Sequence, residues 1–282
     1  MKRLVVVGYP LNHSLSPVMH NAALAELGLD DKYNYEAMPL PSDALPGLVE
    51  SISRHEIEGA NITLPYKTKI TRYLSTISSE GLAVGAVNTL HRENDLVIGS
   101  NTDVRGFIEA IREKGVNPRG LSATILGAGG VAKSVAYALA EAGAIELGIF
   151  NRTIDAARRL ALEIGRNRPV EVRADKTPAK EDLEDSDILI NCTPVGMAGY
   201  SIDESPLEQS NLSSGLVVMD LVYNPLNTRL LRDAQDAGCK TIDGVGMLVH
   251  QGALGFELWT GKPAPIAVMR DAVLQALGVE DG

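Results

Sequence analysis

The sequence predicts an α/β protein with two domains, each built on a mostly parallel sheet. Short runs rich in Val, Ile and Leu alternate with longer helix-like segments, which is typical of parallel strands covered on both faces. At 282 residues the chain is long enough for two ordinary domains. Hydrophobic residues make up 45% and charged residues 22%, as in compact globular proteins.

The first part of the chain, residues 1–102, begins with an apolar strand at Leu4–Gly8. A helix is expected over Ser16–Leu27, because Pro17 suits its first turn and Gly28 ends it. The other strands expected here are Tyr33–Ala37, Gly59–Thr63 and a pair within Ala83–Asn101 that is divided by the turn Glu93-Asn94-Asp95.

The second part, residues 103–244, opens with a connecting helix at Val104–Lys114 that is stopped by Gly115. A fresh series of strands and helices follows it. The expected elements are strand Ser122–Leu126, helix Val131–Ala142, strand Ile145–Phe150, helix Ile154–Ile164, and strands Ile188–Asn191 and Leu216–Asp220. Residues 245–282 contain two helix-like segments, Leu248–Leu258 and Ala264–Leu277, and we expect them to complete the first domain.

Composition excludes several function classes. The formal net charge of −10, with no Lys/Arg run, disfavours nucleic acid and anionic lipid as partners. The apolar run at the N-terminus is interrupted at Gly8 and Pro10, too early for a signal peptide, and no stretch of ~18 apolar residues suggests a membrane span. Cys192 and Cys239 lack metal-ligand spacing, so we expect reduced thiols, no metal and a cytoplasmic enzyme.

A glycine-rich turn lies where a dinucleotide site requires it. Gly127, Gly129 and Ala132 form a G-x-G-x-x-A pattern between a predicted strand and a predicted helix. The first glycine permits the tight turn, the second lets a pyrophosphate approach the backbone, and the alanine allows close helix–strand packing. This context favours a Rossmann-like site over a simple connecting turn.

The end of the next strand favours NADP over NAD. NAD enzymes usually place a carboxylate there for the ribose 2′-hydroxyl, but this strand ends in Asn151-Arg152-Thr153. Arg152 can pair with a 2′-phosphate, while Asn151 and Thr153 can donate hydrogen bonds to it. Asp155 would repel a phosphate if it pointed inward, so NAD remains an alternative.

Three polar clusters in the first part suggest a substrate site. They contain Ser14 and Ser16 at a helix start, Asn61 and Thr63 at a strand end with Lys67 shortly after it, and Asn88, Asn101 and Asp103 beside glycines. Each has an ordinary alternative. Ser16 would be a helix N-cap, Lys67 a surface charge, and Asn101 and Asp103 turn or cap residues.

Eight segments, taken in order, resemble the shikimate dehydrogenase family over nearly the whole chain. They are His13-Ser-Leu-Ser-Pro17, Asn61-Ile-Thr-Leu-Pro-Tyr-Lys67, Gly85-Ala-Val-Asn-Thr-Leu90, Asn101-Thr-Asp103, Gly127-Ala-Gly-Gly130, Asn151-Arg-Thr153, Asn191-Cys-Thr-Pro194 and Gly246-Met-Leu-Val-His-Gln-Gly252.

The resemblance implies reversible, NADPH-dependent reduction of 3-dehydroshikimate to shikimate in chorismate and aromatic amino acid biosynthesis, with the active site in a cleft between the domains. Lys67 and Asp103 would be the catalytic pair. The residues implied in substrate binding are Ser14, Ser16, Asn61, Thr63, Asn88, Asp103, Tyr223 and Gln251. Those implied in NADP binding are Gly127, Ala128, Gly129, Gly130, Val131, Asn151, Arg152, Thr153, Leu221, Gly244 and Met247.

Three alternatives stay open at this level. One is a quinate/shikimate dehydrogenase that uses NAD, and Asp155 keeps it open. Another is a non-catalytic cofactor-sensing homologue, against which the presence of both Lys67 and Asp103 argues. A methylenetetrahydrofolate dehydrogenase-like enzyme would not need the polar sets of the first part. Monomer and homodimer are equally compatible with the sequence.

Overall fold

The computed structural model describes residues 1–11 and 14–279, which divide into two compact units. Unit 1 comprises Met1–Gly106 and Leu248–Gly282, and unit 2 comprises Phe107–Met247. The chain passes between the units inside two helices, α4 (Asp103–Glu113) and α9 (Val245–Thr260).

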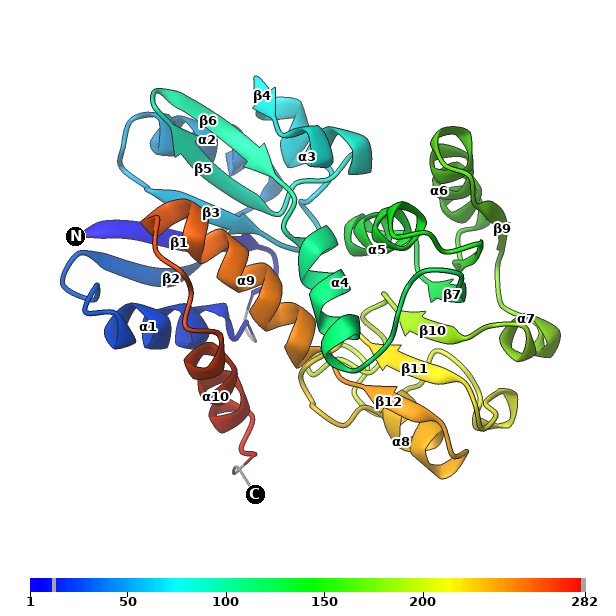
Figure 1. Ribbon diagram of the computed structural model, residues 1–282. Coiled ribbons are helices and arrows are strands. Elements are labelled where there is room, and N and C mark those ends of the chain that lie inside the picture. Colours follow the sequence, from blue (N-terminus) through cyan, green and yellow to red (C-terminus); the bar gives the residue numbers. More distant parts are fainter. Residues whose placement is uncertain (12–13, 280–282) are drawn as a thin grey trace. The chain divides into compact units, whose positions relative to one another are not determined.

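Unit 1 is built on a six-stranded mixed sheet in the order β2-β1-β3-β5-β6-β4 (Figure 1). The strands are β1 (Lys2–Gly8), β2 (Tyr33–Pro39), β3 (Gly59–Ile62), β4 (Thr76–Ile77), β5 (Thr89–Glu93) and β6 (Leu96–Ser100). β1 pairs in parallel with both β2 and β3, whereas β5 runs antiparallel to β3 and β6. The helices are α1 (Ser16–Glu26), α2 (Leu45–Ser53), α3 (Ser79–Val84) and α10 (Ile266–Ala276), with short 3₁₀ turns at Ser42–Ala44 and Ile70–Tyr73.

Alternation along β1 distributes apolar side chains to both faces of this sheet. Val5 and Val7 pack in a buried cluster with Leu45 and Leu48 of α2. Successive strand residues point to opposite faces, so the equally buried Val6 faces away from α2. Both faces of the sheet are therefore covered, as the continuous apolar run of β1 predicts.

Unit 2 is an all-parallel six-stranded sheet in the order β12-β11-β10-β7-β8-β9. The strands are β7 (Ser122–Leu126), β8 (Glu146–Phe150), β9 (Glu171–Asp175), β10 (Ile188–Asn191), β11 (Val217–Asp220) and β12 (Lys240–Ile242). The helices are α5 (Gly130–Glu141), α6 (Ile154–Asn167), α7 (Lys180–Glu184) and α8 (Arg229–Asp236), with a 3₁₀ turn at Gln209–Asn211. Counted from β7, this is the 3-2-1-4-5-6 order of dinucleotide-binding sheets, with its switch point between β7 and β10.

One predicted element is wrong. The paired strands expected from Ala83 onward begin only at Thr89, because Ser79–Val84 forms α3. Ser78 caps this helix by accepting a hydrogen bond from the Gly81 N–H at 3.1 Å, and Gly85 ends it with φ of 67°. The antiparallel hairpin itself is confirmed, and Asn94 adopts φ of 55° in its turn.

No helix within the described ranges, 1–11 and 14–279, has the length and apolar character needed to span a membrane.

Candidate active site

Lys67 and Asp103 form an ion pair in unit 1, with Nζ 2.7 Å from Oδ2. The Asp103 side chain is 3% exposed and that of Lys67 is 17% exposed, so solvent screens the pair weakly while the ammonium stays accessible. Asp103 is the first residue of α4, where the helix dipole stabilises a carboxylate. The geometry brings a proton donor and an anion together.

Asn88 holds the second oxygen of Asp103. Its Nδ2 lies 2.9 Å from Asp103 Oδ1 and 2.8 Å from Thr102 Oγ1, and 3.2 Å from Gln251 Oε1. The Thr102 N–H donates to Asn88 Oδ1 at 2.7 Å, which fixes the orientation of the amide. Asn88 is 1% exposed, so water does not compete for its side chain. Its fixed amide therefore orients the Asp103 carboxylate.

Asn101 joins the end of β6 to the start of α4. Its Nδ2 donates to the Ala86 carbonyl at 2.9 Å, and its Oδ1 accepts from the Val104 N–H at 3.2 Å. Asn101 thus holds the turn that leads into α4, in line with its alternative interpretation as a turn or cap residue, whereas Asp103 takes part in the ion pair.

Asn61 belongs to the same buried network, since it contacts the Asn88 carbonyl and Thr89 Oγ1 through Nδ2 at 3.3 and 3.2 Å. Gln251 lies in α9, where its Nε2 donates to the Leu248 carbonyl at 2.7 Å. One hydrogen-bonded network thus joins residues that are far apart in the sequence: Asn61, Lys67, Asn88, Asp103 and Gln251.

Ser14, Ser16 and Thr63 have no hydrogen bond to this network among the residues that the structure describes. Ser14 Oγ accepts from the Ser16 N–H at 3.4 Å. The N-cap of α1 is Leu15, which provides no side-chain acceptor, so the cap interpretation of Ser16 is wrong. The N-cap residue itself therefore supplies no acceptor to the first N–H groups of α1, and the Ser16 N–H is met by Ser14 instead. His13, which opens the first of the eight segments, lies outside the described residues.

In unit 2 the glycine-rich turn follows β7 at the switch point of the sheet. Gly127 has φ of 108°, and a Cβ there would lie 3.2 Å from the Cys192 carbonyl carbon and oxygen at the end of β10. Gly129 is the N-cap of α5 and faces open space, with no atom within 4 Å of a Cβ placed there. Ala132 is completely buried. The tight turn, the open backbone and the close packing of the helix match the three roles expected of this pattern.

Arg152 and Thr153 are exposed directly after β8, with Asn151 half-buried beside them. Asn151 Nδ2 donates to the Thr153 carbonyl at 2.9 Å, which closes the turn. Asp155 is also exposed, in the first turn of α6. An arginine, a threonine hydroxyl and the adjacent open glycine backbone fit a dinucleotide with a 2′-phosphate.

Leu221 and Gly244 meet in unit 2, because a Cβ on Gly244 would lie 2.6 Å from the Leu221 carbonyl oxygen. Met247 is 5% exposed and packs in the interior, as its alternative interpretation as a core residue expects. Val131, at the start of α5, and Tyr223, three residues beyond β11, are half-buried.

Asp220 is a buried carboxylate at the end of β11 to which no sequence motif assigns a role. It accepts hydrogen bonds from Asn191 Nδ2 at 2.9 Å, the Val222 N–H at 3.0 Å and Thr228 Oγ1 at 2.7 Å. Burial raises its pKa to about 6, although these three hydrogen bonds act in the opposite direction. Asp220 thus ties β10, the segment carrying Leu221, and the cap of α8 together.

Replacing Asp220 with Asn should remove a pH dependence of stability. The folded protein holds the Asp220 proton more tightly than the unfolded chain does, so this contribution is present at low pH and is lost as pH rises through about 6. Between pH 7 and pH 5 the wild type should gain about 1 kcal/mol relative to Asp220→Asn in urea unfolding. Asp236→Asn, at an exposed carboxylate of α8, should behave as the wild type does. Equal pH dependence of the wild type and Asp220→Asn would refute this role.

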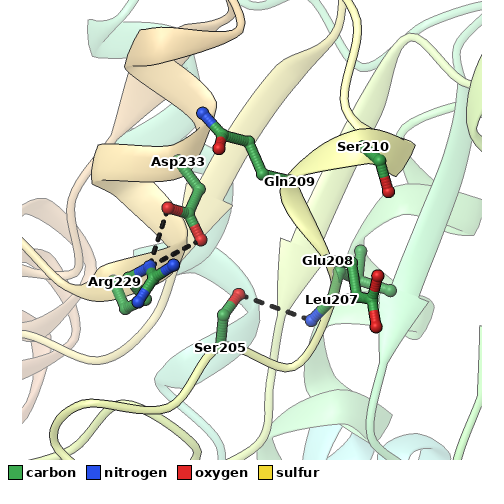
Figure 2. A pocket seen from close by; sticks show the side chains of 7 residues that line it. All are labelled: Ser205, Leu207, Glu208, Gln209, Ser210, Arg229 and Asp233. Atoms are coloured by element: carbon green, nitrogen blue, oxygen red, sulfur yellow. Dashed lines mark hydrogen bonds and ion pairs between the residues drawn. The ribbon is translucent and has the colours of Figure 1, made fainter.

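A hollow of about 440 Å³ lies elsewhere in unit 2 (Figure 2). Arg229 and Asp233 of α8 line it, together with the polar segment from Ser205 to Ser210. Arg229 Nε donates to both carboxylate oxygens of Asp233, at 2.8 and 2.9 Å, so the two charges satisfy each other. None of the predicted site residues lines this hollow.

Comparison with known proteins identifies the family of the chain. A family model for the shikimate dehydrogenase substrate binding domain matches residues 6–90, one for shikimate / quinate 5-dehydrogenase matches 109–244, and one for the shikimate 5′-dehydrogenase C-terminal domain matches 244–274. A shikimate dehydrogenase (NADP(+)) of Methanopyrus kandleri is 46% identical over 277 residues, covering 96% of this chain and 94% of the relative. The chain belongs to the shikimate dehydrogenase family.

Solved structures of this family share the fold over almost the entire chain. Shikimate 5-dehydrogenase from Thermus thermophilus, in complex with NADP(H) and shikimate, is 39% identical with a TM-score of 0.87, covering 98% of this chain and 100% of that one. Quinate dehydrogenase from Corynebacterium glutamicum, in complex with NAD, is 31% identical with the same TM-score of 0.87, covering 97% and 99%. Fold similarity thus extends to relatives that differ in substrate and cofactor, so side chains must decide between them.

Proposed function

We propose that the chain is an NADP-dependent shikimate dehydrogenase that reversibly reduces 3-dehydroshikimate to shikimate, a step of chorismate and aromatic amino acid biosynthesis. The observation that carries this proposal is the partly buried Lys67–Asp103 pair, held by Asn88 in a chain of this family. Unit 1 would bind the alicyclic acid and unit 2 the dinucleotide.

Reduction of a ring ketone places negative charge on the carbonyl oxygen. NADPH supplies the hydride that adds to the carbonyl carbon. Lys67 stabilises the developing charge and donates a proton to the oxygen, while Asp103 holds the ammonium in place. In the oxidative direction the hydroxyl proton passes back to this pair. Both steps need a cation and an anion close to one oxygen, and the 2.7 Å separation of Lys67 and Asp103 supports this assignment.

The remaining polar groups suit a polyhydroxylated acid. Ser14 and Ser16, at the start of α1, would bind its carboxylate, as would Tyr223. Asn61, Thr63, Asn88 and Gln251 would hold its ring oxygens.

Replacing Arg152 tests whether the protein prefers NADP to NAD. Arg152→Ala should raise the Kd of NADP by ~10- to 100-fold, the loss expected for a charge-assisted hydrogen bond, and leave the Kd of NAD unchanged. Titration calorimetry with both nucleotides measures the difference. Arg166→Ala, at an exposed arginine in the last turn of α6, is the matched control. Equal weakening of the two nucleotides by Arg152→Ala would exclude a 2′-phosphate contact.

A quinate/shikimate dehydrogenase that uses NAD is the second candidate, and the exposed Asp155 near Arg152 favours it. Spectrophotometric assays of nicotinamide reduction at alkaline pH separate the two candidates. The proposal predicts turnover with shikimate and NADP well above that with quinate or NAD. Faster turnover with quinate and NAD would establish the second candidate, and no turnover with any pair would support a non-catalytic homologue. We further propose that the protein is cytoplasmic and is a monomer or a homodimer.

A further inference from the structure

Tyr35 of β2 points its hydroxyl at Asn61, with a distance of 2.6 Å between Oη and Asn61 Oδ1. Both side chains are buried, with Tyr35 1% and Asn61 5% exposed. The Asn61 Nδ2 faces the Asn88 carbonyl, which can only accept, so Oδ1 is the atom that faces Tyr35 and the tyrosine is the donor.

Two consecutive residues of α1 hold Tyr35 in this position. Asn21 Nδ2 donates to the Tyr35 carbonyl at 2.8 Å, and Asn21 Oδ1 accepts from the Tyr35 N–H at 2.9 Å, so one amide fixes the backbone. His20 stacks on the Tyr35 ring, with centroids 4.2 Å apart and an interplanar angle of 12°. Burial lowers the pKa of His20 to about 3, so this stack carries no charge near neutral pH.

Helix α9 encloses the same cluster. A Cβ on Gly255 would lie 3.5 Å from Asn61 Nδ2, and one on Gly252 would lie 3.4 Å from His20 Nε2. Trp259 contributes a ring whose centroid is 6.0 Å from that of Tyr35. Packing and hydrogen bonds thus hold the Tyr35 ring in one orientation, so its hydroxyl is suited to orienting another side chain.

Hydrogen bonds continue from Asn61 to the catalytic pair. Asn61 contacts Asn88 O and Thr89 Oγ1, Thr89 Oγ1 lies 3.2 Å from Asn88 Oδ1, and Asn88 Nδ2 binds Asp103. We propose that Tyr35 is a positioning residue, whose hydroxyl fixes the Asn61 amide and, through it, the Asn88 side chain that orients Asp103. The expected effect on kinetics rests on the proposed function, whereas the expected effect on the Asn61 amide does not.

Tyr35→Phe tests the proposal because it removes only the hydroxyl and leaves the ring that stacks on His20. Loss of one buried hydrogen bond should lower kcat/KM for shikimate by ~3- to 10-fold, while KM for NADP changes by less than about 2-fold. Tyr33→Phe is the matched control, since Tyr33 lies on the same strand with its hydroxyl on the Trp259 carbonyl at 3.5 Å. It should leave both parameters at the wild-type level.

A double-mutant cycle with Asn61→Ala separates positioning from general destabilisation. If Tyr35 acts through Asn61, adding Tyr35→Phe to Asn61→Ala should cause no further loss of kcat/KM. Effects that multiply, a wild-type value for Tyr35→Phe, or a parallel loss of shikimate and NADP parameters would each overturn the proposal.

A second readout does not depend on activity. The Asn61 side-chain amide signals in an ¹⁵N-labelled sample should shift in Tyr35→Phe and stay in place in Tyr33→Phe. A wild type that fails to oxidise shikimate would refute the proposed function alone. Unchanged Asn61 signals in Tyr35→Phe would refute the positioning role alone.

Discussion

Lys67→Ala should lower the turnover of shikimate by ~100-fold or more and leave the affinity for NADP close to that of the wild type. Lys67 is the cation of the partly buried pair, and its ammonium is 2.7 Å from Asp103, so its removal takes away both the proton donor and the stabilising charge. Steady-state kinetics and an NADP titration on the same preparation measure the two quantities. Turnover near the wild-type level would exclude Lys67 as the proton donor.

Two controls accompany this variant. Lys69→Ala removes an exposed lysine two residues further along, whose ammonium lies 5.8 Å from the centre of the Tyr66 ring, and should keep wild-type turnover. Because Lys67→Ala leaves the Asp103 carboxylate without its counter-ion, unfolding should be followed as well, and rates expressed per folded molecule.

Asp103→Asn should produce a loss of turnover of similar size, on the order of 100-fold. The amide has the shape of the carboxylate, but it brings no charge to the Lys67 ammonium and its NH₂ group cannot accept from it. Glu109→Gln, which changes an exposed carboxylate on the same helix α4, should have little effect. A near-normal rate for Asp103→Asn would remove the anion from the mechanism.

The two variants also test whether the pair acts as a unit. Groups that act together give losses that do not multiply, so the double variant should be hardly slower than the slower single variant. Independent contributions would instead give a loss near the product of the two.

Much of the fold follows from local patterns. The apolar run of β1 and the glycine-rich turn between β7 and α5 each carry their signal within a dozen residues. Weak local signals explain three of the elements that the sequence does not predict. β9 lies at the edge of its sheet and is only partly buried, so its sequence contains no apolar run. β12 is only three residues long. α3 is six residues long, and its Ala83 and Val84 resemble the alternation of the strands that follow.

The residues of the candidate site, too, could be predicted only in part from the sequence. Lys67 and Asp103 were identified through family resemblance, because no local pattern reveals that residues 36 positions apart form an ion pair. In the sequence Asp220 is only the last residue of a predicted strand. Its role depends on the hydrogen bonds that Asn191 and Thr228 donate to it in the folded chain. Tyr35 has the pattern of a core aromatic, and its role depends on Asn61, 26 residues away. Long-range contacts of this kind need the folded chain.

A crystal structure of the protein with shikimate and NADP bound would show whether Lys67 and Asp103 act on the substrate. Lys67 Nζ and a carboxylate oxygen of Asp103 should both lie within about 2.6–3.2 Å of the ring hydroxyl that is oxidised. A complex in which that hydroxyl contacts neither side chain would contradict this catalytic role.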